Sequence, residues 1–578
     1  MKNPIPLSAT IGVLLIALGA CSKQEETSAV APGHSLPSRP APFTVVEASF
    51  ADMQAAMTEG RATSREIVEQ YLERINRYDK ALGASISIAG DALEQADALD
   101  QERAAGQVRG LLHGIPVALK DNIHTLDMPT TAGALAFAGY IPPYEATLVE
   151  NLRAAGAIII AKTTLTELAN WVATGMPNNY NAVNGYGYNP YDPRPDPRPG
   201  FNDGRGVMDT GGSSSGIGTA ANLWAANVGT ETSGSLQIPS NNTRLVGIKP
   251  TVGRISGRGV IPITNDQDTA GAMAKYVADA AALLAAMEGT NNDDANTGVC
   301  PGPGAQGYTA HLRKDGLRGA RIGIPRAFYF EPITPPGETL PRGGLREQQR
   351  ATMRAAIAAM RAAGAEIVDP ANIPSVVATQ AQDNQLLFGN CYDLPQGKGG
   401  DSNCSVILKY GMKRDFNNWL DSLGDSRPVE SLTALREFNQ AHEDEGAIRY
   451  GQAQLDISDQ MDVAADKERY LADRAKDIRL ARTEGIDAAL QTHRLDALLF
   501  PAWYGENIIN KAGYPVIAVP FSEVPNVLDP AAPSNFSRRP IPFGVTFAGT
   551  ACSEPRLIEI AYSFEQATRG RQAPQATP

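Results

Sequence analysis

The distribution of hydrophobic positions predicts strands that alternate with helices along most of the chain. Residues 114–123 alternate apolar side chains at Ile115, Val117 and Leu119, which is typical of a strand. Residues 146–163 combine a helical pattern with three consecutive isoleucines, and such a run is typical of a strand buried on both faces. The alternation predicts an α/β protein with a largely parallel or mixed sheet.

The second half of the chain continues this pattern. Residues 353–370 again pass from a helical to a strand-like pattern. Three apolar runs suit strands, and the last of them is followed by a helical pattern: residues 496–503, 515–521, 542–549 and, for the helix, 554–567. No separable region is visible, so we expect a single large domain.

Local sequence signals predict the start of one helix, one long loop and one further helical segment. Thr63 and Glu66 have capping-box spacing, which predicts that a helix follows Thr63. Residues 189–206 are rich in Pro and Gly and predict a long loop, and loops of that length are often functional lids or insertions. Residues 220–228 are apolar and predict a helix-like segment.

The N-terminal segment is predicted to direct export. Residues 1–20 contain an apolar run that is shorter than the roughly 20 residues needed to span a membrane, as in a signal peptide. Its ending LGAC resembles the bacterial lipobox, in which Cys21 would carry lipid; an ordinary signal peptide with a chance cysteine is the alternative. Ser22 fits sorting to the outer membrane. Residues 21–44 are polar and predict a flexible tether. We therefore expect a periplasmic protein that is anchored to the membrane by lipid.

Composition places residues 45–570 in one ordinary globular domain, with residues 571–578 as a tail. Hydrophobic residues make up 43% of the chain and charged residues 20%, which allows a sizeable core. The net charge of −12 argues against a protein that binds nucleic acid.

Cysteine and histidine positions add little chemistry. Export would permit disulfides, and Cys391 and Cys404 flank a turn-rich segment, so they are the most plausible pair; free buried thiols are the alternative. The histidines are scattered and form no metal-binding motif, so we expect no metal and no cofactor.

Residues 209–240 are rich in serine and glycine and raise the question of a nucleophile. Apolar residues interrupt the segment, so it is not a linker. Gly212–Gly216 matches the G-x-S-x-G nucleophile elbow around Ser214, but no strand precedes it and His493 is the only candidate base.

A serine activated by lysine is the other option. Lys120 follows a predicted strand, and a lysine can serve as the base for a serine nucleophile. Ser235 follows Thr232, Ser233 and Gly234, whose successive backbone N–H groups could converge on an oxyanion. A buried salt bridge of Lys120, to Asp121 or Glu167, is the structural alternative.

Five segments, in order, resemble the amidase signature hydrolases, and together they cover residues 45–570. The resemblance implies hydrolysis of a carboxamide through an acyl-enzyme, without metal or cofactor, on a mixed sheet of about eleven strands covered by helices on both faces. The segments are residues 111–123, 155–171, 211–240, 247–273 and 542–566.

The resemblance also implies roles for individual residues. Lys120 matches the catalytic lysine, Ser213 the bridging serine held by a cis peptide, and Ser235 the nucleophile. The backbone N–H groups of Thr232, Ser233, Gly234 and Ser235 match the oxyanion hole. Residues that could shape a pocket for a small-molecule or peptide amide are Trp171, Met176, Tyr180 and Trp503.

The chain departs from the family pattern in three places. Ser213 and Ser235 are 22 residues apart, a shorter spacing than usual, so Ser214 and Ser215 stay open as the bridging serine. Gln237 stands where a basic residue is usual, and the loop at 189–206 is longer than usual.

Two other functions remain open at this point. The glutamine-hydrolysing subunit of an aminoacyl-tRNA amidotransferase resembles the same family, but it works in the cytoplasm, which the export signal argues against. A solute-binding lipoprotein would fit the signal and the tether, yet it has no need for Lys120, Ser213 and Ser235 together.

Overall fold

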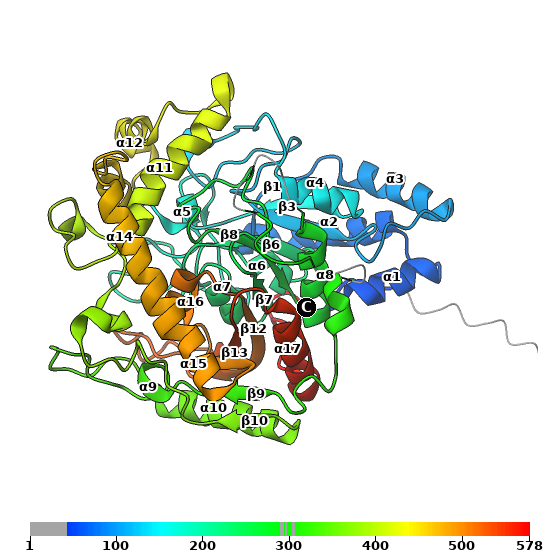
Figure 1. The fold of residues 1–578 in the computed structure, drawn as a ribbon. Helices are drawn as coiled ribbons and strands as arrows, with labels where there is room; N and C mark the ends of the chain where they lie inside the picture. The colour runs from blue at the N-terminus through cyan, green and yellow to red at the C-terminus, as the bar shows by residue number, and fades with distance from the viewer. Residues whose placement is uncertain (1–42, 290–293, 295–296, 303–306) are drawn as a thin grey trace, which may run out of the picture. The chain divides into compact units, whose positions relative to one another are not determined.

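An eleven-stranded mixed sheet forms the centre of the computed structural model, which describes residues 43–289, 294, 297–302 and 307–578 (Figure 1). The strand order is β1-β3-β2-β6-β8-β7-β12-β13-β11-β9-β10. The expected α/β class, single domain and strand number are therefore confirmed. The strands are β1 Ser85–Ile88, β2 Pro116–Lys120, β3 Ile158–Thr163, β6 Ala226–Glu231, β7 Val246–Lys249, β8 Thr269–Ala274, β9 Arg321–Gly323, β10 Glu366–Val368, β11 Ala497–Pro501, β12 Val516–Val524 and β13 Ile541–Ala548; β4 Tyr180–Asn181 and β5 Gly185–Tyr186 form a separate hairpin.

Three parallel strands near one end of the sheet carry the expected site. β2 runs parallel to both β3 and β6, whereas the pairs β6–β8, β8–β7, β7–β12 and β12–β13 are antiparallel. Every residue of β2, β3 and β6 is buried, which explains the apolar run in β3. The carboxyl ends of β2 and β6 therefore lie at the same edge of the sheet.

Helices flank the sheet (Figure 1). The α8 and α17 helices pack against its middle strands, α8 on β7 and β8 and α17 on β12 and β13. No helix in the described part of the chain is long and apolar enough to cross a membrane. The helices are α1 Phe50–Thr58, α2 Ser64–Leu82, α3 Ala92–Ala104, α4 Thr147–Ala154, α5 Glu167–Asn170, α6 Ile217–Ala220, α7 Gln237–Asn242, α8 Val277–Met287, α9 Arg326–Tyr329, α10 Glu347–Ala362, α11 Ile407–Ser422, α12 Leu432–Ala441, α13 Ala453–Asp459, α14 Lys467–Ile478, α15 Asp487–His493, α16 Glu506–Ala512 and α17 Glu554–Thr568.

Several local predictions can be compared with these elements. Thr63 caps α2 through the expected capping box with Glu66, so that prediction is confirmed. The helix-like reading of residues 220–228 is wrong, because the chain leaves α6 at Ala220 and enters β6 at Ala226. The apolar side chains of this segment belong to a strand that is buried on both faces, so they show neither helical nor alternating periodicity.

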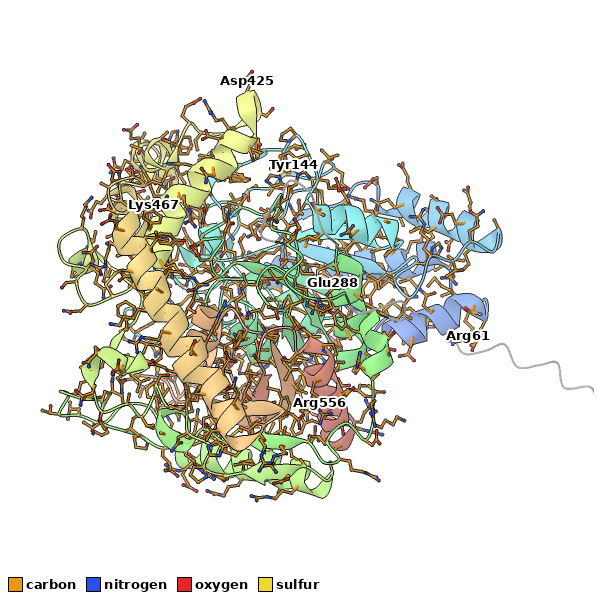
Figure 2. The ribbon with its side chains drawn as sticks, viewed as in Figure 1. Arg61, Tyr144, Glu288, Asp425, Lys467 and Arg556 are labelled. Atoms are coloured by element: carbon orange, nitrogen blue, oxygen red, sulfur yellow. A yellow bond between two sulfur atoms is a disulfide. The ribbon has the colours of Figure 1, made fainter. Side chains whose placement is uncertain are left out.

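A second apolar cluster lies beside the main core. It combines one face of α11 and a few side chains of α12, α13 and α14 with residues of the segments 132–137, 168–180 and 391–406. Figure 2 labels Asp425, just beyond the end of α11, and Lys467, the first residue of α14. Tyr144, also labelled there, joins this cluster to the loop before α4, because its hydroxyl lies 3.0 Å from Ser422 Oγ.

Two disulfides link the described cysteines. Cys391 pairs with Cys404, as the sequence favoured. Cys300 pairs with Cys552, a partnership that no sequence pattern indicated, since the two residues are 252 positions apart.

The two ends of the chain differ from the expected domain plan in one respect. The signal segment, Cys21 and the tether up to residue 42 lie outside the described residues. Residues 571–578, expected as a tail, instead pack against the domain. Arg571 forms an ion pair with Glu47 at 2.8 Å, and Thr577 is buried. The ion pair of Arg571 and the burial of Thr577 therefore hold this segment against the domain.

Candidate active site

Lys120 lies at the end of β2 with its amino group among hydroxyl and carbonyl oxygens. Nζ donates to Ser213 Oγ at 2.7 Å, to Thr230 Oγ1 at 2.8 Å and to the Thr230 carbonyl at 3.3 Å. The side chain is fully buried. Burial lowers the pKa of Lys120 to about 7, although the carboxylates of Asp268 and Glu231 favour the charged form.

Lys120 does not form the alternative salt bridge to Asp121 or Glu167. Asp121 points to another lysine, Lys162, at 3.1 Å. Glu167 accepts a hydrogen bond from the backbone N–H of Ala182 at 3.1 Å. No carboxylate of the described residues forms an ion pair with Lys120, so this amino group can be neutral near pH 7.

The two serine segments contact each other at their backbones. Ser214 N–H donates to the Ser235 carbonyl at 3.2 Å. A Cβ atom on Gly212 would lie 2.9 Å from Ser235 Cα, closer than real Cβ atoms come, so glycine is needed for this approach. The Ser214 side chain is occupied elsewhere, because Oγ donates to the Thr230 carbonyl at 2.8 Å. Ser214 is therefore poorly placed to be a nucleophile.

Glu231 fixes the turn that carries Ser235. Its carboxylate accepts the N–H groups of Leu236 at 2.6 Å and Gln237 at 2.9 Å, and it also accepts the Gln237 side-chain amide at 2.5 Å. Gln237, which replaces the basic residue usual in the family, is thus turned inward to Glu231. Gly234 has φ of +86° in this turn, and a Cβ atom there would lie 2.6 Å from Ile238.

The backbone of Thr232–Ser235 retains free donors. Within the described part of the chain, the N–H groups of these four residues donate to no protein acceptor. Unpaired N–H groups in successive residues beside a hydroxyl are the donor arrangement that an oxyanion requires. Ser235 itself is 6% exposed.

Two expected features of the bridging serine are absent. Between the described residues, no hydrogen bond joins the hydroxyls of Ser213 and Ser235. The cis peptide expected before Ser213 is also not found, because the cis peptides of the described chain precede Pro370 and Pro530. The structure thus brings Lys120 to Ser213, and brings the Ser213 segment to the backbone of Ser235.

Two carboxyl groups flank the Ser235 turn, and neither was anticipated from the sequence. Asp268 accepts a hydrogen bond from Thr232 Oγ1, and Glu506 accepts one from Ser233 Oγ at 3.3 Å. Burial raises the pKa of each carboxyl to about 7. Tyr392 lies near the same turn, close enough for its hydroxyl group to interact with the Ser233 side chain.

A cavity of about 620 Å³ opens at this turn. Its wall includes Thr230 and Thr232 and the aromatic side chains of Tyr144 and Trp419. No local sequence signal distinguishes Trp419, which comes from a helix of the second apolar cluster.

None of the four residues expected to shape the pocket lines the 620 Å³ cavity. Trp171 is buried and donates from Nε1 to Ser458 at 2.9 Å, and Tyr180 packs on Tyr186 and Tyr450. Trp503 is half-buried against Tyr504. Met176 lines a cavity of about 310 Å³, which is different from the one at the Ser235 turn.

A left-handed turn contributes to the wall of the 620 Å³ cavity. Leu168, Ala169 and Asn170 have φ of 45°, 56° and 70°, and Ala169 lines the cavity. Three consecutive non-glycine residues in this region are costly, at roughly 1–2 kcal/mol each. Such conformations persist where the surrounding structure enforces them, and they are frequent at active sites.

The fold and this arrangement of serine, lysine and free backbone donors define an amide-hydrolysing enzyme. The chain belongs to the Amidase family, which it matches over residues 66–558.

Individual relatives agree with this assignment. The chain is 31% identical to a probable amidase of Arabidopsis thaliana over 540 residues, 92% of each protein. It is 35% identical to the solved peptide amidase of Stenotrophomonas maltophilia, with a TM-score of 0.75 over 93% of this chain and 100% of that one. One component of the glutamyl-tRNA(Gln) amidotransferase of Anaeromyxobacter sp. is 37% identical over 53% of this chain and 56% of that protein.

Proposed function

We propose that this protein is an exported amidase that hydrolyses a carboxamide through a Ser-Ser-Lys triad of Ser235, Ser213 and Lys120. The observation that carries the proposal is the 2.7 Å contact between the buried Lys120 amino group and Ser213 Oγ, beside the Ser235 turn with its free N–H groups. The substrate is proposed to be a peptide or small-molecule amide. The 35% identity to a peptide amidase supports the peptide.

The reaction follows from these positions. Neutral Lys120 takes the proton of Ser213, which takes that of Ser235 as its hydroxyl attacks the amide carbon. The N–H groups of Thr232–Ser235 hold the oxyanion while the proton passes back through Ser213 to the leaving nitrogen. The C–N bond breaks, ammonia or an amine leaves, and an acyl ester forms on Ser235. Water then attacks the ester by the same route and releases the carboxylate.

The proton path requires one movement. Because the Ser213 and Ser235 hydroxyls form no hydrogen bond here, a side-chain rotation has to close that gap. Contacts of this kind often tighten only when substrate binds.

Export is supported by cysteine pairing. Four of the five cysteines form two disulfides, and such bonds persist in oxidising compartments. Cys21 is the cysteine left over, as expected for a residue that carries lipid. The same disulfides argue against the cytoplasmic amidotransferase subunit.

The test is covalent labelling with a fluorophosphonate. We expect mass spectrometry to place one adduct on Ser235, and Ser235→Ala to lose labelling and activity. A solute-binding protein would not label, and an adduct on Ser214 would support the nucleophile elbow. His493→Ala should keep its activity, since His493 ends α15 and no contact of the described residues links its side chain to the serines.

A further inference from the structure

The loop at 189–206 builds a second cavity, of about 310 Å³, with the segments at 526–528 and 541–542. This volume is at the lower end of the range for small-molecule sites, which suits one or two amino-acid residues. The lining includes the apolar side chains of Met176, Phe201, Met208, Leu528, Ile541 and Pro542.

The two arginines that face this cavity are already paired with carboxylates, and the carboxylate of Asp209 in its wall accepts hydrogen bonds from Asn178 Nδ2 and the Gly211 N–H, both at 2.9 Å. Arg198 pairs with Asp196 at 2.6 Å, and Arg205 pairs with Asp203 at 2.6 Å. The Arg198 guanidinium also lies 4.1 Å above the ring of Phe201. An anionic ligand would therefore find no unpaired cation here and would lose its hydration on entry.

One polar group in the wall lacks a partner. Asn526 is 8% exposed, and its Nδ2 donates to no described residue. A buried donor of this kind is satisfied by a ligand that brings an acceptor. The cavity therefore suits an uncharged, apolar group that carries a carbonyl oxygen, such as a residue of a peptide.

The cavity is close to the proposed nucleophile. Thr210 belongs to its wall, and Gly212 packs against Ser235 Cα. Two residues span at most about 7 Å, so the wall begins within roughly 10 Å of Ser235. An extended peptide advances about 3.3 Å per residue and covers that distance in about three residues.

We propose that this cavity is a substrate subsite, which binds an uncharged apolar residue about three positions before the scissile amide of a peptide substrate. The inference rests on the proposed function of Ser235. It adds that the 189–206 loop makes the enzyme prefer peptide amides over short amides.

The test compares kcat/KM for three substrates: acetyl-Leu-Ala-Ala-amide, acetyl-Asp-Ala-Ala-amide and acetyl-Ala-amide. We expect the leucine peptide to exceed the other two by about tenfold or more, as burial of one leucine side chain would give. Leu528→Trp fills the cavity and should lower the preference for the leucine peptide about tenfold.

Val527→Trp is the matched control, because Val527 is the adjacent residue, 51% exposed and outside the cavity wall. This variant should keep the wild-type preference. Asn526→Leu, which removes the unpaired donor, gives a second variant in case the tryptophan prevents folding. Asn526→Leu should lower the preference for the leucine peptide, because KM for that peptide should rise.

Equal kcat/KM for the three substrates, or an equal loss of preference in Val527→Trp, would overturn the subsite. If Ser235→Ala loses turnover but the wild-type kcat/KM does not depend on peptide length, the subsite is contradicted and the proposed function stands. If Ser235→Ala stays active, the proposed function fails as well.

Discussion

Two buried lysines on adjacent strands show how surroundings set the chemistry of a side chain. Lys162 lies 3.1 Å from the carboxylate of Asp121, so its charge is compensated. Among the described residues, the Lys120 amino group donates hydrogen bonds to oxygens of Ser213 and Thr230 and pairs with no carboxylate. A buried ammonium group without a carboxylate partner releases its proton more readily, which is what a general base requires.

Activity should therefore depend on pH through Lys120. The pKa of Lys120 is about 7, so we expect kcat/KM to rise as pH increases through about 7 and then to level off. Lys120→Arg should lose at least about 10³-fold at every pH, because arginine cannot release its proton. Lys162→Arg is the control and should keep the midpoint. A midpoint near 10, or an active Lys120→Arg enzyme, would contradict the role of Lys120.

Glu167 predicts an unusual pH dependence of stability. Burial raises its pKa to about 8, and one of its oxygens has no partner among the described residues. Between about pH 4.5 and pH 8 the unfolded chain releases a proton that the folded chain keeps, so the free energy of unfolding falls as pH rises, by about 1.4 kcal/mol per unit.

Glu167→Gln should remove this dependence. Relative to the wild type, the variant should gain about 2–4 kcal/mol in urea unfolding between pH 5 and pH 8. Glu150→Gln, an exposed glutamate of α4, serves as the control and should show no such gain. The reasoning is wrong if both variants follow the wild type across this range.

At the scale of helices and strands, the sequence predicted those elements whose own residues contain a periodicity or a capping motif. The isoleucines of β3, the capping box of α2 and the position of Lys120 at the end of β2 could all be predicted, because local periodicity and spacing determine them. The left-handed turn at 168–170 could not, since it contains no glycine to signal it and tertiary packing imposes it.

Contacts between distant segments were also beyond prediction. Asp268 reaches Thr232, and Tyr392 reaches Ser233, through the fold rather than through any pattern near them. The pairing of Cys300 with Cys552 is of the same kind. The site could thus be predicted for residues in the signature segments but not for those that surround them.

The two disulfides should have separable effects. In the chain-entropy model, the 252-residue link between Cys300 and Cys552 stabilises by about 5 kcal/mol, and the 13-residue link between Cys391 and Cys404 by about 3 kcal/mol. The shorter link lies close to the site, because Cys391 precedes Tyr392, whose side chain lies near Ser233.

We therefore expect opposite rankings in two measurements. Replacing both Cys300 and Cys552 by alanine should lower stability more, as measured by denaturant unfolding, and leave kcat/KM at 25 °C near normal. Replacing both Cys391 and Cys404 should lower stability less and kcat/KM several-fold. Equal losses of activity in the two variants would remove the proposed link through Tyr392.

For the whole molecule, lipid attachment at Cys21 is the remaining prediction. The expressed protein should partition into detergent, and Cys21→Ala should leave it unprocessed or water-soluble, because a chain without lipid has no anchor. Phase partition and intact mass measure this. A wild-type protein released in water-soluble form would contradict the anchor.

The order of the strands also determines when the sheet can be completed during synthesis. The first six strands in the order come from residues 85–274 and the other five from residues 321–548, and the two halves meet where β7 pairs with β12. About 270 residues separate these two strands, so a ribosome working at 5–20 residues per second needs roughly 15–50 s to supply the partner of β7. Throughout that interval β7 offers an unpaired edge, which other nascent chains can join. The risk that this edge pairs with another chain therefore depends on how quickly the second half of the protein is synthesised.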